Sequence, residues 1–205
     1  MHSEISEKHL CGQPLIDCFR IIENFHGWKA PGLVIGMFMI DLARELVGES
    51  VESDAIVETR HCLPDAIQLF TPCTIGNGWM KIVDWDKFAL SLYDRKNRNG
   101  YRVWLDLEKT KQFPDLYNWY MRRVPKKTLP LEVLVNTILS AQRAILSYES
   151  IYITRLYERD KKGKTTICSV CKEAYAEKLG KVCISCQGRG YYTASENLIN
   201  ERSEQ

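Results

Sequence analysis

The C-terminal part of the chain contains two pairs of cysteines whose spacing is typical of metal ligands. The pattern is Cys168-x2-Cys171, then eleven residues, then Cys183-x2-Cys186. Two C-x-x-C turns can bring four thiolates to the corners of a tetrahedron, the geometry of structural zinc sites with Zn–S distances of about 2.3 Å. An iron–sulfur centre can use the same ligands and is the alternative metal group. We predict one structural Zn²⁺ per chain at these cysteines.

A site closed by four thiolates leaves no coordination position for a substrate or a water molecule. Such a metal contributes to folding and carries out no reaction itself. The segment around the cysteines has few apolar residues, so we expect it to fold only with its metal bound. Its exposed-type residues Arg189, Tyr191 and Tyr192 could contact nucleic acid, although packing or subunit docking is the interpretation that we favour.

Three side chains in the first half of the chain are further candidates for chemistry. His26 ends a helical pattern, Cys62 stands just before a helix start, and Cys73 lies in the turn-rich segment TPCTIGNG. A helix N-terminus lowers the pKa of a thiol and favours the thiolate. Each residue also has a purely structural interpretation, since free cysteines commonly fill small gaps in a core and a histidine on an apolar helix face is commonly hydrogen-bonded there.

The elements that would position these residues can be read from hydrophobic periodicity and from turn residues. Apolar positions at helical spacing predict helices over 14–26, over 31–47 starting at Pro31, and over 131–148. Shorter helices are expected from Pro64 through Phe70 and over 115–123. Gly32 and Gly36 lie on one face of the second helix, where they would allow close packing of a neighbour.

Strand-like runs follow in the middle of the chain, at 54–59, 79–83, 88–93 and 101–107, with a turn at 97–100 between the last two. Helices and strands in this order predict an α+β domain, with helices packed on a mostly antiparallel sheet. The polar, lysine-rich segment 158–166 separates this domain from the cysteine module. We therefore expect an α+β domain at 1–160 and a small four-cysteine zinc-finger domain at 161–205.

Composition excludes several classes of protein. The formal net charge is +2, from 28 basic and 26 acidic residues, so no strong field would attract nucleic acid or anionic membrane. No apolar run approaches the roughly 18 residues that span a bilayer, and the polar N-terminus does not have the pattern of a secretory signal. We expect a cytoplasmic protein, where paired cysteines serve metal binding rather than disulfides.

Two stretches of the sequence resemble the FmdE family of formylmethanofuran dehydrogenase proteins, named for its association with a molybdenum or tungsten enzyme of methanogenesis. They are FHGWKAPGLVIG at 25–36 and ETRHCLPDAIQLFTPCTIGNG at 58–78, and the two C-terminal C-x-x-C pairs agree with them. The resemblance implies an α+β core, often joined to a zinc finger, and a homodimer.

The resemblance also implies a metal or reactive site, because the family's His-Gly-His stretch and its two motif cysteines correspond to His26, Cys62 and Cys73. The second histidine of that pattern is Trp28 here, so one potential ligand is absent. We expect these three side chains to converge in one cleft, where they could hold a second metal ion or provide a reactive thiol.

Three functions remain as hypotheses at this point. The first is a zinc-binding accessory protein of a molybdenum or tungsten oxidoreductase. The second is a stand-alone enzyme that uses the site of His26, Cys62 and Cys73, either as a nucleophile or as an open metal site. The third is a zinc-finger protein that binds nucleic acid, against which the charge balance argues.

Overall fold

The computed structural model describes residues 9–125, 129–155 and 163–192. The chain forms two compact units, Met1–Tyr157 and Glu158–Gln205. The boundary predicted between residues 160 and 161 lies outside the described residues. No helix in the described ranges is both long and apolar enough to cross a membrane.

A five-stranded sheet forms the centre of the first unit, with the strand order β4-β3-β5-β6-β7. Its strands are β3 (Ser53–Val57), β4 (Met80–Ile82), β5 (Ala89–Asp94), β6 (Asn99–Leu105) and β7 (Leu146–Tyr152). β3 and β4 are parallel, and the other neighbouring pairs are antiparallel. The prediction of an α+β fold with a mostly antiparallel sheet is therefore confirmed.

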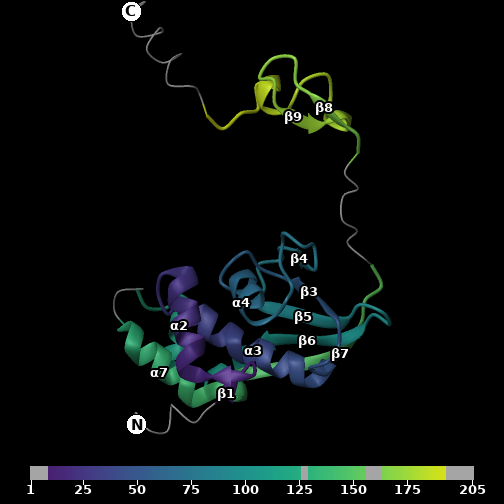
Figure 1. Ribbon diagram of the computed structural model, residues 1–205. Coiled ribbons are helices and arrows are strands. Elements are labelled where there is room, and N and C mark those ends of the chain that lie inside the picture. The colour runs from purple at the N-terminus through teal and green to yellow at the C-terminus, as the bar shows by residue number, and fades with distance from the viewer. Residues whose placement is uncertain (1–8, 126–128, 156–162, 193–205) are drawn as a thin grey trace, which may run out of the picture. The chain divides into compact units, whose positions relative to one another are not determined.

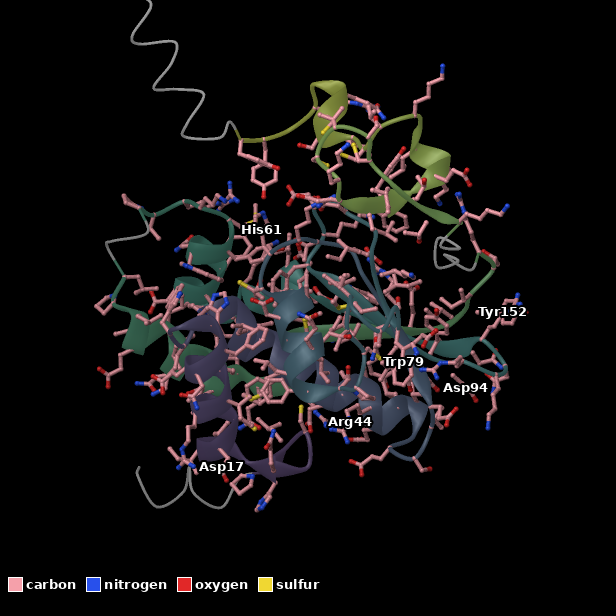
Figure 2. All side chains as sticks on the ribbon, turned by 45° about the horizontal axis from the view of Figure 1, so that its top comes forward. Asp17, Arg44, His61, Trp79, Asp94 and Tyr152 are labelled. Carbon is pink, nitrogen blue, oxygen red and sulfur yellow. The ribbon has the colours of Figure 1, made fainter. Side chains whose placement is uncertain are left out.

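Helices pack against this sheet and against one another (Figure 1). They are α2 (Leu15–His26), α3 (Pro31–Val47), α4 (Leu63–Phe70), α5 (Leu107–Thr110), α6 (Pro114–Tyr120) and α7 (Leu131–Ala141). A two-stranded hairpin, β1 (His9–Leu10) with β2 (Gln13–Pro14), precedes α2. The hairpin is fastened to α3 because Arg44, labelled in Figure 2, donates a hydrogen bond from Nη1 to the carbonyl of Cys11 at 3.0 Å.

α3 is the central helix of the unit because it is apolar on nearly all sides. Its residues from Pro31 to Ile40 are all buried, and it packs against α4, α7, β5 and β6. Pro31 suits the first turn, where a backbone N–H has no helical partner. Gly36 lets α4 come close, since a Cβ there would be 2.8 Å from the Cβ of Ala66. The close packing predicted for this glycine face is confirmed.

The prediction of one helix over 131–148 is wrong in its second half. α7 ends at Ala141, a 3₁₀ turn follows at Gln142–Ile145, and the chain then enters β7. Gln142 has a positive φ of 48°, which a continuing α-helix does not allow. The segment after it pairs with β6 over its full length, so sheet formation outweighs the helical periodicity of the apolar positions.

The second unit is small and is built on a two-stranded hairpin. Its elements are β8 (Thr165–Ile167), β9 (Ala174–Ala176) and two 3₁₀ turns, η2 (Glu177–Leu179) and η3 (Ser185–Gln187). Most of its described side chains are exposed, including Ile167 and Val170. Because so little apolar surface is buried, another interaction must stabilise this unit.

Candidate functional site

The four C-terminal cysteines come together in the second unit. Cys168 and Cys171 lie on the turn between β8 and β9, and Cys183 and Cys186 lie on and beside η3. Their sulfur atoms all lie within 4.8 Å of one another, and the Sγ atoms of Cys171 and Cys183 are 3.7 Å apart. Thiolates at Zn–S distances of about 2.3 Å in a tetrahedron are separated by about 3.8 Å. The cluster therefore fits a zinc ion.

Backbone N–H groups already direct their dipoles toward one of these sulfurs. The N–H of Cys183 points to the Sγ of Cys168 at 3.5 Å. Hydrogen bonds from the backbone of Cys183 and Cys171 lower the pKa of the Cys168 thiol to about 6, which favours its thiolate at neutral pH. Hydrogen bonding with Cys183 and the neighbouring thiols raises the pKa of Cys186 to about 12. A divalent cation that displaces the remaining protons would balance the crowded negative charge.

His26 lies at the C-terminal end of α2, where it forms a pair with a carboxylate. Its Nδ1 is 2.9 Å from Oδ2 of Asp65, which belongs to the first turn of α4. Gly27 follows in the left-handed conformation at φ 87° and ends the helix. A carboxylate at Nδ1 favours a proton on that nitrogen and leaves Nε2 free to accept a proton or to bind a metal.

Cys62 is the N-cap residue of α4 and has a positive φ of 53°. Its thiol also lies over the first turn of α3, because a Cβ on Gly32 would be 2.8 Å from Sγ of Cys62. The ring of Phe88 borders the same position and makes an edge-to-face contact with Tyr120. The half-buried thiol thus lies at the N-termini of two helices, where partial positive charge favours a thiolate.

Cys73 is fully buried in the hydrophobic core. Its Sγ donates a hydrogen bond to the carbonyl oxygen of Ser53 at 3.3 Å, and burial raises the pKa of this thiol. Both features keep it protonated and unreactive.

Within the described ranges, the cysteine cluster of the second unit is the single group of three or more His, Cys, Asp or Glu ligands close enough to hold a metal. The structure therefore does not bring His26, Cys62 and Cys73 together as a three-ligand site. It pairs His26 with Asp65 instead and places Cys73 in the core. The likeness of a sequence motif did not distinguish a core cysteine from a reactive one, because both occur in turn-rich segments.

The fold and the cysteine cluster together define an α+β domain followed by a small zinc finger. Residues 159–193 match the family described as the FmdE treble clef zinc finger. Residues 25–153 match the family described as FmdE, molybdenum formylmethanofuran dehydrogenase operon. Because this second match covers more than half of the chain, the protein belongs to the FmdE family and carries the family's treble-clef zinc finger.

A solved structure supports this assignment over nearly the whole chain. It is an FmdE-like protein of tungsten formylmethanofuran dehydrogenase from Syntrophus aciditrophicus, 40% identical, with a TM-score of 0.81. The similarity covers 91% of this chain and 98% of that one. A probable S-adenosyl-L-methionine-binding protein from Archaeoglobus fulgidus is 35% identical over 101 residues, which are 44% of this chain. The chain spans only 27% of the length of that curated relative.

Proposed function

We propose that this protein is a zinc-containing accessory subunit of a molybdenum or tungsten oxidoreductase in the cytoplasm. The observation that carries the zinc assignment is the cluster of four sulfur atoms within 4.8 Å of one another. Cys168, Cys171, Cys183 and Cys186 would hold one Zn²⁺ and leave no open coordination position. The oxidoreductase assignment is supported by the family to which the chain belongs and by the description of its structural relative.

The zinc assignment is tested by replacing one ligand and measuring metal content. Cys171→Ser should reduce bound zinc from one per chain to nearly none, because a three-thiolate site without a fourth protein ligand loses most of its affinity. Cys62→Ser is the matched control, since it removes a thiol from the first unit and should retain the zinc. Zinc content that is unchanged in Cys171→Ser would refute the ligand assignment.

The accessory role is tested by purifying the tagged protein from its native host. A large molybdenum- or tungsten-containing subunit should copurify, and it should be detected both by metal analysis and by mass spectrometry. The Cys171→Ser variant shows whether the finger contributes to the association. Purification of the wild-type protein free of any molybdenum or tungsten enzyme, under conditions that preserve such complexes, would contradict the role.

A second function is favoured by the arrangement around Cys62. A thiol at two helix N-termini, near a histidine that is oriented by a carboxylate, is suited to nucleophilic chemistry. Under this alternative Cys62 is the nucleophile, and the His26–Asp65 pair is the proton acceptor. Cys73 has no part in it, because its thiol is buried in the core.

Thiol labelling of the zinc-loaded protein tests this alternative. At neutral pH iodoacetamide should modify Cys62 first, whereas burial keeps Cys11, Cys18 and Cys73 protonated and protected; burial raises the pKa of Cys18 to about 11. Peptide mapping by mass spectrometry gives the order of labelling. If Cys62 reacts no faster than a simple thiol such as glutathione, the activated nucleophile is excluded.

We also propose that the protein is a homodimer, as the family resemblance implies. A chain of 23.8 kDa should then give a mass near twice this value by light scattering. A monomeric mass at all concentrations up to about 100 μM, far above the Kd of a stable dimer, would overturn this proposal.

A further inference from the structure

β7 is the last strand of the five-stranded sheet and pairs with β6 on one side only. Its seven residues, LSYESIY, contain no proline and no lysine. Edge strands of monomeric proteins are usually protected by such residues, by bulges or by covering elements. Tyr148, Ser150 and Tyr152 are exposed on this strand. The edge therefore has the properties of a strand that is paired in the functional molecule.

The hydrogen bonds that flank β7 determine which of its backbone groups face the open edge. The N–H of Asp106 donates to the carbonyl of Ile145, and the N–H of Ile153 donates to the carbonyl of Arg98. In an antiparallel pair, bonding toward one neighbour alternates with every second residue. Ser147, Glu149 and Ile151 therefore bond toward β6. The intervening residues direct their N–H and C=O groups away from it.

One of the outward-facing residues already has a partner. Nζ of Lys109 donates a hydrogen bond to the carbonyl of Leu146 at 2.6 Å, which caps the edge at its start. Beyond this cap the outward N–H and C=O groups belong to Tyr148, Ser150 and Tyr152. These three residues are spaced evenly about Ser150, so the uncapped segment is symmetric in its backbone groups.

We propose that β7 pairs antiparallel with β7 of a second copy of this chain, around a twofold axis at Ser150. The proposal rests on the homodimer proposed above and assigns its interface. Tyr148 would lie opposite Tyr152 of the partner subunit, and Ser150 opposite the partner's Ser150. Each directly bonded antiparallel pair exchanges two hydrogen bonds, so the pairing would form about six and use every uncapped group of the segment. The two sheets would become one continuous sheet.

Charge and aromatic packing favour this register over its neighbours. A twofold axis one residue earlier would place Glu149 directly opposite the partner's Glu149, a destabilising pair of like charges. In the proposed register Glu149 lies opposite Ile151 instead. Tyr148 already contacts Tyr101 edge-to-face at 6.2 Å, and the partner's Tyr152 would extend this pair into a row of three rings.

A hollow beside the strand leaves room for this aromatic row. An open cavity of about 470 Å³ is lined by Leu46, Tyr101, Ser150 and Tyr152 and by the side of Asp94. Tyr152 and Asp94 lie at the same end of the molecule in Figure 2. Tyr148 of the partner subunit would approach its rim, so the second copy would contact the core as well as the strand edge.

The proposal is tested by proline substitution at the centre of the segment. Ser150→Pro removes one outward N–H and adds a ring to the open edge, while the ladder to β6 does not use this N–H. It should raise the dimer dissociation constant at least tenfold. Ser150→Ala changes the side chain but keeps the N–H, and should dimerise like wild type. Sedimentation equilibrium gives the constants, and far-UV circular dichroism shows whether the variant is folded.

A second measurement tests the register without weakening the fold. Ser150→Cys should form a disulfide between the two copies on mild oxidation, since directly bonded residues have Cα atoms about 5.5 Å apart, within disulfide range. Glu149→Cys, one residue away on the opposite sheet face, should cross-link no more than wild type.

The outcomes separate this proposal from the homodimer itself. A folded Ser150→Pro variant that dimerises normally, together with no cross-link through Ser150→Cys, overturns the β7 interface and leaves the homodimer standing. A monomeric wild-type protein overturns both. If β7 binds a strand of a different protein, isolated wild type is monomeric and a Ser150→Cys adduct joins two different chains, which also overturns the proposal.

Discussion

The position of the Cys62 thiol depends on a glycine from another helix. Any side chain at position 32 would collide with Cys62, since its Cβ would lie 2.8 Å from Sγ and 2.9 Å from Cβ of that residue. These neighbours belong to the start of α4 and cannot move without shifting that helix. Gly32 therefore sets both the packing of two helices and the position of the candidate nucleophile.

Gly32→Ala should lower the free energy of unfolding by about 1–3 kcal/mol, the usual effect of overpacking a tight contact. It should also change the rate at which Cys62 reacts with iodoacetamide. Urea unfolding and thiol labelling measure the two effects. Gly76→Ala is the matched control, because its nearest neighbour would be 3.8 Å away and its stability should change by less than about 0.5 kcal/mol.

At this scale the sequence predicts residue types well and their partners poorly. The four finger cysteines could be predicted because spacing alone determines which sulfur atoms can share a metal. The approach of Gly32 to a neighbour could also be predicted, as a small residue on an apolar helix. The pairing of His26 with Asp65 could not, because residues 39 apart in sequence meet only through the packing of α2 on α4.

Among the elements, β3 and β6 are joined by a nearly buried ion pair next to the sheet. Arg102 donates from Nε and Nη2 to both carboxylate oxygens of Glu58, at 2.6 and 2.8 Å. The Glu58 side chain is 4% exposed and that of Arg102 is 21% exposed. These hydrogen bonds raise the pKa of Arg102. The carbonyl of Glu58 also accepts from the N–H groups of Trp85 and Lys87, so the pair anchors the loop before β5.

Arg102→Met should lower the free energy of unfolding by about 3–5 kcal/mol, because it leaves a carboxylate buried without its partner. The double variant Glu58→Met with Arg102→Met should recover much of this loss. Arg60→Met removes the partner of Asp84 from a far more exposed pair and should cost less than about 1 kcal/mol. Denaturant unfolding of the four proteins provides the comparison. Equal losses for Arg102→Met and Arg60→Met would contradict the argument.

Most elements of the first unit follow from local sequence, and the exception is the end of one helix. α3 begins at Pro31 and ends at Val47, just before Gly48, as its proline and glycine predict. The end of α7 could not be predicted, because Leu134, Ile138, Ala141 and Ile145 keep helical spacing into the next element. Only the open edge of β6, formed far away in sequence, decides that residues 146–152 extend as a strand.

The whole molecule consists of two units with their own internal contacts. The first has an extensive apolar core, whereas the second buries little and depends on its metal. Their stabilities should therefore respond differently to a chelator.

A zinc chelator should unfold residues 163–192 and leave the first unit intact. Thermal unfolding followed by tryptophan fluorescence reports only the first unit, because all five tryptophans precede residue 120. Its Tm should shift by less than about 2 °C on zinc removal, within the effect of a few tenths of a kcal/mol for a domain of this size. Loss of the fluorescence transition after zinc removal would show that the two units depend on each other.

The order of the strands in the sequence also has a kinetic consequence. β5 and β6 are joined by a short turn and can meet within about 1–10 μs, the time scale of hairpin formation. β7 reaches β6 only across a long loop, since Arg102 and Glu149 are 47 residues apart. During synthesis at about 5–20 residues per second, β6 therefore waits seconds for its neighbour. Tyr148→Ala should then accelerate unfolding and leave the refolding rate nearly unchanged in stopped-flow experiments, because β7 adds after the transition state. In the nascent chain, the sheet edge most exposed to misassembly is one that the finished protein conceals.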